Sequence, residues 1–185
     1  IDQKKIKQVY PELYPDIDIV ALNKEFGDSE ESLLFLTGVP GVGKTSFIRY
    51  MLKCFEPTLE QNSDVPLQRS AASIAYVKDT ALMADNEFWS SLASRQYDMI
   101  VFDDLDFALG TRQPGDGGGL VNQLLSYSDG IFGKGTRIVI TTNVEIKDID
   151  VALLRPGRCF DFLELTALTY DETIKIWTDV LGMQI

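Results

Sequence analysis

Histidine is missing from the 185 residues, and there are only two cysteines, Cys54 and Cys159, which lie far apart. The commonest zinc ligand is therefore absent, and the cysteines have no spacing typical of a metal site. Two separated cysteines predict reduced thiols in a cytoplasmic protein. Long apolar runs are also missing: stretches such as 33–36 and 99–102 have four residues, whereas a membrane span needs roughly 18. The sequence predicts no transmembrane helix and no membrane partner.

Basic residues are scarce as well. Lysine and arginine number 17 against 28 aspartates and glutamates, which gives a formal net charge of −11. Non-specific binding to nucleic acid depends on clustered lysine and arginine, so this balance argues against DNA or RNA as the partner. The hydrophobic fraction of 45% and the charged fraction of 24% are close to globular averages. We therefore expect a folded, acidic domain of ordinary size.

Apolar runs separated by helical patterns indicate the fold class. The predicted strands lie at 33–37, 73–77, 99–102, 137–141 and 160–165. The predicted helices lie at 45–55, 86–94, 119–128 and 170–181, with a short one around 151–154. This alternation is typical of an α/β fold, here a three-layer, doubly wound, five-stranded parallel sheet. The glycine-rich stretch 112–119 predicts an exposed loop.

A glycine-rich loop lies between the first predicted strand and the helix that follows, and it matches the pattern G-x-x-x-x-G-K-[ST]. Its glycines let the backbone turn N–H groups toward a phosphate, and the positive end of the next helix adds to that field. We expect Lys44 to reach the β- and γ-phosphates of ATP and the Thr45 hydroxyl to bind Mg²⁺. The alternative is a strand-to-helix turn that binds nothing. The predicted nucleotide-binding residues are Gly38, Val39, Pro40, Gly41, Val42, Gly43, Lys44, Thr45 and Ser46.

Two carboxylates, Asp103 and Asp104, follow the predicted strand 99–102, as in a Walker B motif. Strand ends in open α/β sheets face the ligand crevice, so Asp103 is expected to hold Mg²⁺ and Asp104 to polarise the attacking water. The alternative is a solvated acidic turn. The second acid is more usually glutamate, so Asp104 leaves open a slower or altered reaction. Asp106 is a competing candidate, ranked lower because it lies beyond the strand end.

Two further motifs complete a pattern. The fourth predicted strand closes on Thr141-Thr142-Asn143, and it is followed by Ala152-Leu153-Leu154-Arg155-Pro156-Gly157-Arg158-Cys159-Phe160-Asp161. With the two Walker motifs, these residues resemble the AAA+ ATPases, specifically the AAA proper clade with its second region of homology. The resemblance covers about residues 30–168. It implies the large nucleotide-binding subdomain of a P-loop NTPase.

The resemblance implies roles for three more residues. Asn143 matches sensor 1, a polar side chain that helps to orient the attacking water. Arg155 and Arg158 match paired arginines that reach the nucleotide site of a neighbouring subunit, where a planar, permanently charged guanidinium stabilises phosphate oxygens. Such fingers act in trans, so they imply a homo-oligomeric ring, expected to be a hexamer. The alternatives are exposed surface charges for the arginines and a strand-end turn for Asn143.

The resemblance also divides the chain. Residues 1–29 lead into the fold, 30–168 form the large subdomain, and 169–185 begin a helical lid that is truncated and largely absent. Residues 14–19 either line the adenine or form an N-terminal hydrophobic plug. No glycine follows the second predicted strand between residues 73 and 97, which argues against a substrate-threading pore loop. The aromatic pair Phe88-Trp89 is predicted to pack in the core.

These observations predict a Mg²⁺-dependent ATPase that uses its nucleotide cycle, in a ring, to remodel a macromolecular partner. The acidic charge favours protein over nucleic acid as that partner. One alternative is a nucleotide-dependent assembly scaffold or switch with little turnover, consistent with Asp104 in place of glutamate. A second is a DNA-handling loader or helicase accessory, against which the net charge argues.

Overall fold

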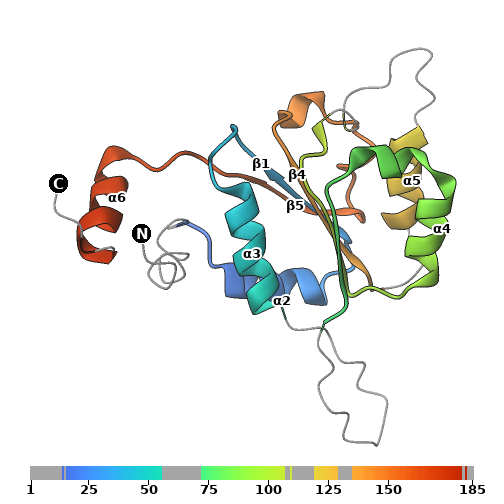
Figure 1. Cartoon of the computed structure of the whole chain (residues 1–185), viewed down its shortest axis with the longest axis horizontal. Coiled ribbons are helices and arrows are strands. Elements are labelled where there is room, and N and C mark those ends of the chain that lie inside the picture. Colours follow the sequence, from blue (N-terminus) through green and yellow to red (C-terminus); the bar gives the residue numbers. More distant parts are fainter. Residues whose placement is uncertain are drawn as a thin grey trace, which may run out of the picture.

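A computed structural model of the chain describes residues 14, 16–55, 72–106, 109, 119–128, 135–180 and 182. Its centre is a five-stranded parallel sheet in the order β2-β3-β4-β1-β5 (Figure 1). The strands are β1 (Leu33–Thr37), β2 (Ile74–Val77), β3 (Met99–Phe102), β4 (Arg137–Thr142) and β5 (Cys159–Glu164). The predicted α/β fold with a five-stranded parallel sheet is confirmed.

Helices cover both faces of the sheet (Figure 1). Helices α2 (Ile19–Asp28) and α3 (Lys44–Cys54) lie on one face, and α4 (Asn86–Ser94) and α5 (Gly119–Ser128) lie on the other. Successive side chains of a strand point to opposite faces, so β1 contributes Leu34 and Leu36 to one apolar cluster and Leu33 and Phe35 to the other. All of β1 is buried. Strand β1 therefore packs against the helices on both faces of the sheet.

Two segments differ from the sequence prediction. Helix α2 was not predicted, although Asp18 caps it by accepting the backbone N–H groups of Val20 and Ala21 at 3.0 Å. The stretch 151–154 forms hydrogen-bonded turns instead of the predicted helix. At the start of these turns, the Asp150 carboxylate accepts the Ala152 N–H at 2.9 Å. Pro156-Gly157 follow so closely that no helix can extend there. Of the predicted loop 112–119, residues 112–118 lie outside the described residues and Gly119 begins helix α5.

The other short elements lie on the connections. The 3₁₀ helices are η1 (Thr80–Ala84) and η3 (Ile146–Asp148). Near the C-terminus, α6 (Tyr170–Lys175) continues as a π-helical turn, η4 (Ile176–Val180). Helix α6 begins with a capping box between Thr169 and Glu172. It lies beyond an extended stretch that leads away from β5 (Figure 1).

Trp89 packs in the core as predicted. Its side chain is 5% exposed, and its indole N–H donates to the Met83 carbonyl oxygen at 2.8 Å. Its ring centroid lies 5.7 Å from that of Phe102 and 5.9 Å from that of Tyr127. An indole fixed in this way packs α4 against α5 and β3. It is not exposed for contact with a substrate.

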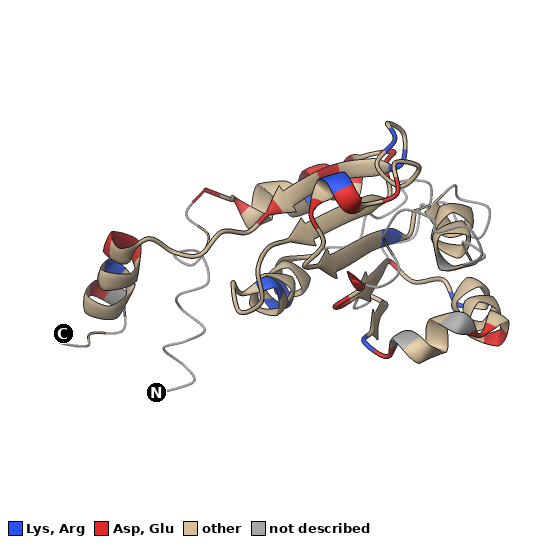
Figure 2. Cartoon of the chain, turned by 90° about the horizontal axis from the view of Figure 1, so that it is seen from above, with Lys and Arg blue, Asp and Glu red and all other residues tan. Residues whose placement is uncertain are grey.

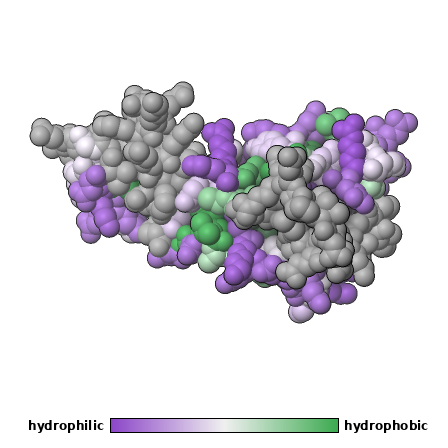
Figure 3. All heavy atoms as spheres, turned by 90° about the horizontal axis from the view of Figure 1, so that it is seen from below, coloured by the Kyte–Doolittle hydropathy of each residue, from purple (hydrophilic) through white to green (hydrophobic). Residues whose placement is uncertain are grey.

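On the face seen from below, most of the described side chains are hydrophilic (Figure 3). The main group of apolar atoms on this face lies near its centre, beside hydrophilic side chains. Among the described residues, no helix combines the length and the apolar character needed to cross a membrane.

Arg137 fastens the end of α2 to the sheet. From the first position of β4, its guanidinium donates to the carbonyl oxygens of Gly27 at 2.6 Å, Ser29 at 2.7 Å and Glu31 at 3.3 Å. The guanidinium carbon also lies 5.6 Å from the centroid of the Phe26 ring. A cation that satisfies carbonyls at a helix C-terminus also complements the helix dipole.

We expect Arg137→Ala to lower the free energy of unfolding by about 2–4 kcal/mol, because it leaves part-buried carbonyl oxygens without donors. Urea unfolding monitored by tryptophan fluorescence measures the change. Arg95→Ala, at the exposed end of α4, is the matched control and should stay within about 0.5 kcal/mol of the unsubstituted chain. Equal stability of the two variants would contradict the role of Arg137.

Candidate active site at the ends of β1, β3 and β4

The order of the strands brings three sequence motifs to one edge of the sheet. Strand β4 lies between β1 and β3, with Thr142 paired to Thr37 and Ile140 paired to Phe102. All three strands are parallel, so the segments that follow them emerge side by side, where open α/β sheets bind ligands. The segment after β4 therefore lies between the loop after β1 and the carboxylates after β3.

The loop after β1 has the backbone of a phosphate cradle. Gly43 precedes α3 in the left-handed conformation, with φ 103°, and no side chain caps the helix. The uncapped N–H groups of the first turn are thus left for a ligand, and the helix dipole favours an anion there. Gly38 has φ 144°, and a Cβ at this position would lie 2.3 Å from the Leu165 carbonyl oxygen. Thr45 lies partly buried on the first turn of α3.

Lys44 is folded over this loop and is only 7% exposed. Its ammonium donates to the carbonyl oxygens of Gly38 at 2.7 Å and Val39 at 3.3 Å, and to Asn143 Oδ1 at 2.6 Å. An ammonium has three N–H donors, so each has a partner. The structure thus brings together two residues predicted separately, one from the loop and one from the end of β4.

Asp103 is a fully buried carboxylate. Its Oδ1 accepts the Thr141 hydroxyl at 2.6 Å, and its Oδ2 accepts the Tyr76 hydroxyl. Burial, together with the charges of Asp103 and Asp104, raises the pKa of Tyr76, so the phenol keeps its proton and stays a donor. The Lys78 ammonium lies 3.9 Å from Asp103 Oδ2. Sequence analysis missed Tyr76 and Lys78, because only the pairing of β2 with β3 brings them to the carboxylate.

The Asp104 side chain is more exposed to solvent than that of Asp103. Its side chain is 51% exposed and lies 3.5 Å from the Lys78 ammonium. Its backbone N–H donates to the Thr141 hydroxyl oxygen at 2.9 Å, and its φ is 62°. Aspartate is among the few residues enriched in this left-handed conformation. The local backbone thus gives a physical reason for aspartate where glutamate is more usual.

Asp106 lies close to Asn143. Its carboxylate accepts the Thr142 hydroxyl at 2.9 Å, the Asn143 backbone N–H at 2.6 Å and the Asn143 side-chain N–H at 2.6 Å. Burial raises the pKa of Asp106, but the hydrogen bonds from Asn143 and Thr142 and the charge of Lys44 outweigh burial and lower it overall. The sequence analysis ranked Asp106 behind Asp104, whereas the structure connects it to the site.

The two arginines lie on the turns that precede β5. Arg158 donates to the Ala152 carbonyl oxygen at 3.0 Å, which holds it against its own loop. Arg155 is exposed, and no hydrogen bond or ion pair is found for its guanidinium within the described residues. Contacts with the described residues therefore leave Arg155 available to another molecule.

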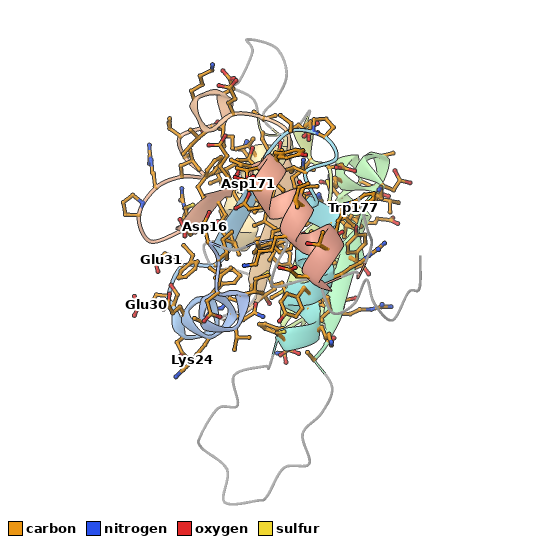
Figure 4. All side chains as sticks on the ribbon, turned by 90° about the vertical axis from the view of Figure 1, so that its left-hand side faces the viewer. Asp16, Lys24, Glu30, Glu31, Asp171 and Trp177 are labelled. Carbon is orange, nitrogen blue, oxygen red and sulfur yellow. The ribbon has the colours of Figure 1, made fainter. Side chains whose placement is uncertain are left out.

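A cavity of about 220 Å³ lies beside the loop. It is lined by residues before α2, by residues 162–168 and by Glu172 of α6. Figure 4 views the molecule from this side, with Asp16, one of the lining residues, labelled. Tyr14 also lines the cavity, and its hydroxyl donates to the Gly43 carbonyl oxygen at 2.8 Å. Tyr14 and Ile19 are buried in the apolar cluster on this face of the sheet, so the segment both plugs the core and borders a cavity.

The donor set suits ATP with Mg²⁺. Helix N–H groups without a side-chain cap and the Lys44 ammonium suit phosphate oxygens. Mg²⁺ commonly takes one or two protein ligands and completes its shell with water and phosphate, and Thr45 and Asp103 offer a hydroxyl and a carboxylate. The described part of the chain contains no cluster of three or more acidic or cysteine side chains that could hold a metal ion by itself.

A parallel sheet with a phosphate loop after β1 and a buried aspartate after β3 defines the class of P-loop nucleotide-binding proteins. The family model "ATPase family associated with various cellular activities (AAA)" matches residues 34–167. The chain belongs to this AAA family of ATPases, which implies ATP binding. The family resemblance inferred from the motifs is confirmed.

Relatives agree with this assignment. The chain is 32% identical over 143 residues to the vesicular-fusion protein SEC18 of Saccharomyces cerevisiae and 34% identical over 134 residues to that of Candida albicans. It is 30% identical over 154 residues to the vesicle-fusing ATPase of Dictyostelium discoideum. These matches cover 73%, 68% and 79% of this chain but only 19%, 17% and 21% of the relatives. The chain thus corresponds to about a fifth of each relative.

Two glycines of the loop allow a matched test of the cradle. Both have positive φ, but a Cβ at Gly41 would meet nothing within 4 Å, whereas one at Gly38 would press on the Leu165 carbonyl. We expect Gly41→Ala to lower the free energy of unfolding by about 1–2 kcal/mol through backbone strain alone. Gly38→Ala should lower the free energy of unfolding by at least about 1 kcal/mol more than Gly41→Ala, because the clash forces the loop or the end of β5 to move. Urea unfolding of both variants measures this, and an equal cost would contradict the close packing at Gly38.

Proposed function

We propose that this chain binds ATP with Mg²⁺ and hydrolyses it. The observation that carries the proposal is the position of Lys44, a nearly buried cation that bridges the phosphate loop and Asn143 beside the Walker B carboxylates. A buried charge needs partners of opposite or complementary character. The loop carbonyls and an amide oxygen provide these, and a phosphate would be a stronger partner than either.

Each residue at the site has a task that fits its surroundings. Lys44 and the N–H groups of α3 bind phosphate oxygens, and Thr45 and Asp103 hold Mg²⁺, which neutralises charge on the phosphates when bound. Asp104, half-exposed and with no hydrogen bond to its carboxylate among the described residues, is the acid with room to accept a bond from the attacking water. Asn143 orients that water through its amide.

The nucleobase fits the cavity beside the loop. The cavity is close to the phosphate cradle because Tyr14 both lines it and bonds to Gly43. Its mixed lining of apolar and acidic side chains suits a flat heterocycle with exocyclic N–H donors. We therefore place adenine between the segment before α2 and the residues that follow β5.

We further propose that the chain works in a ring, with Arg155 and Arg158 contributed to the site of a neighbouring subunit, and that the ring remodels a protein partner. The exposed guanidinium of Arg155 supports the first point. The charge supports the second, because in Figure 2 the described lysines and arginines are scattered over several elements and do not form one basic face.

A nucleotide-dependent switch with little turnover is a second candidate. The observation that favours it is the pairing of Lys78 with Asp104 at 3.5 Å. A carboxylate paired with a cation is less free to accept a hydrogen bond from the attacking water, so this pair works against rapid hydrolysis. Turnover separates the two candidates.

We expect the concentrated chain to release phosphate from ATP with Mg²⁺ and Lys44→Ala to lower kcat/KM by about 100-fold or more, since a preorganised charge at the phosphates is lost. A phosphate-release assay measures this. Lys24→Ala, on the exposed side of α2, is the control and should match the unsubstituted chain. Phosphate release no faster than that of Lys44→Ala would exclude the ATPase and leave the switch.

The ring can be tested by mixing variants. Arg155→Ala and Lys44→Ala are each expected to be inactive alone, the first lacking the finger and the second the phosphate lysine. Mixed in equal amounts, they should regain part of the activity, because an intact arginine can meet an intact phosphate loop across an interface. Assembly of each variant is checked by light scattering. Assembled mixtures that stay inactive would count against action in trans.

A further inference from the structure

Asp106 is held in place by a backbone contact between the segment after β3 and strand β4. The Leu105 backbone N–H donates to the Thr141 carbonyl oxygen at 2.9 Å, and the Leu105 side chain is fully buried. This backbone contact joins the segment after β3 to the end of β4 and sets the next residue beside Thr142 and Asn143. Asp106 lies beyond the strand, as the sequence predicts, and this contact determines its place.

The carboxylate of Asp106 fixes the amide of Asn143. Its Oδ1 accepts the Asn143 backbone N–H and its Oδ2 accepts the Asn143 side-chain N–H, both at 2.6 Å. An ionised carboxylate only accepts hydrogen bonds, so the NH₂ half of the amide must face Asp106. The carbonyl half then faces the opposite way, where it accepts the Lys44 ammonium at 2.6 Å.

Lys44 favours the same orientation of the Asn143 amide only while its ammonium donates to Asn143 Oδ1. When Lys44 turns to a phosphate, the amide oxygen loses this donor, and Asp106 is the remaining described side chain that distinguishes the two ends of the amide. If the Asn143 amide rotated by half a turn, its NH₂ group and its carbonyl oxygen would exchange positions. The reacting groups would then face a donor in place of an acceptor, or the reverse.

We propose that Asp106 is a positioning residue: it holds the Asn143 amide in the orientation that hydrolysis requires, without itself touching nucleotide. The inference rests on the proposed ATPase function and deepens it. Asp106 does not act as the base, because its oxygens already accept three hydrogen bonds, whereas the Asp104 carboxylate is half-exposed.

The first test is Asp106→Asn, which keeps the shape but places an NH₂ group against Asn143. We expect kcat to fall by about tenfold or more, because the amide is misoriented, while KM for ATP stays within about twofold. Asp85→Asn is the matched control: it removes the same charge at the N-cap of α4, where asparagine caps equally well, and should leave kcat unchanged.

A double variant separates positioning from a merely structural role. If Asp106 acts through Asn143, Asp106→Asn combined with Asn143→Ala should be no slower than Asn143→Ala alone. Two losses that multiply in the double variant would overturn the proposal, and so would a single variant Asp106→Asn with the kcat of the unsubstituted chain.

The orientation of the amide can be observed without turnover. The side-chain amide signals of Asn143 in nitrogen-resolved NMR are assigned by their loss in Asn143→Ala. They should shift in Asp106→Asn and stay in place in Asp85→Asn, and unmoved signals in Asp106→Asn would overturn the contact. An unsubstituted chain that releases no phosphate would instead refute the ATPase, and with it a role in hydrolysis, while the amide signals still decide whether Asp106 holds Asn143.

Discussion

The site depends on the insertion of β4 between β1 and β3. The phosphate loop follows β1 and the carboxylates follow β3, so Asn143, directly after β4, contacts Lys44 on one side and Asp106 on the other. Within β4, the Thr141 hydroxyl donates to Asp103 and accepts the backbone N–H of Asp104. One side chain in the middle strand thus sets the positions of two acids that belong to another strand. A shift in the register of β4 would separate all of these contacts at once.

The parts of the fold that the sequence predicts well are those with a strong local signal. Strand 33–37 and helices 86–94 and 119–128 have the predicted bounds, because continuous apolar runs and helical spacing do not depend on distant residues. Helix α2 was missed although Ile19, Leu22 and Phe26 lie on one face behind an aspartate cap. The boundary implied by the family resemblance lies at residue 30, after this helix has ended.

The residues of the candidate site also differ in how far local sequence signals predict them. Lys44, Asp103 and Asn143 could be selected from the sequence because each belongs to a motif with fixed spacing, and their roles stay predictions. Tyr76 and Asp106 could not be assigned a contact, because the groups they meet lie on other strands, and only the order of the sheet shows which strands are neighbours. Asp106 in particular forms its contacts because the Leu105 backbone N–H, beyond the end of β3, donates to the Thr141 carbonyl oxygen of β4. Local patterns predict the chemistry of a site, whereas tertiary pairing decides how its groups are oriented.

Tyr14 gives the cavity and the phosphate loop a common wall. Its ring packs edge-on against Phe47 of α3, with centroids 5.0 Å apart, and its hydroxyl holds the carbonyl at the start of that helix. Under the proposed function, any coupling between ligand groups on the two sides of Tyr14 is reciprocal. Whatever factor a phosphate in the loop adds to the affinity of the cavity for its occupant, that occupant must add to the affinity of the loop for phosphate.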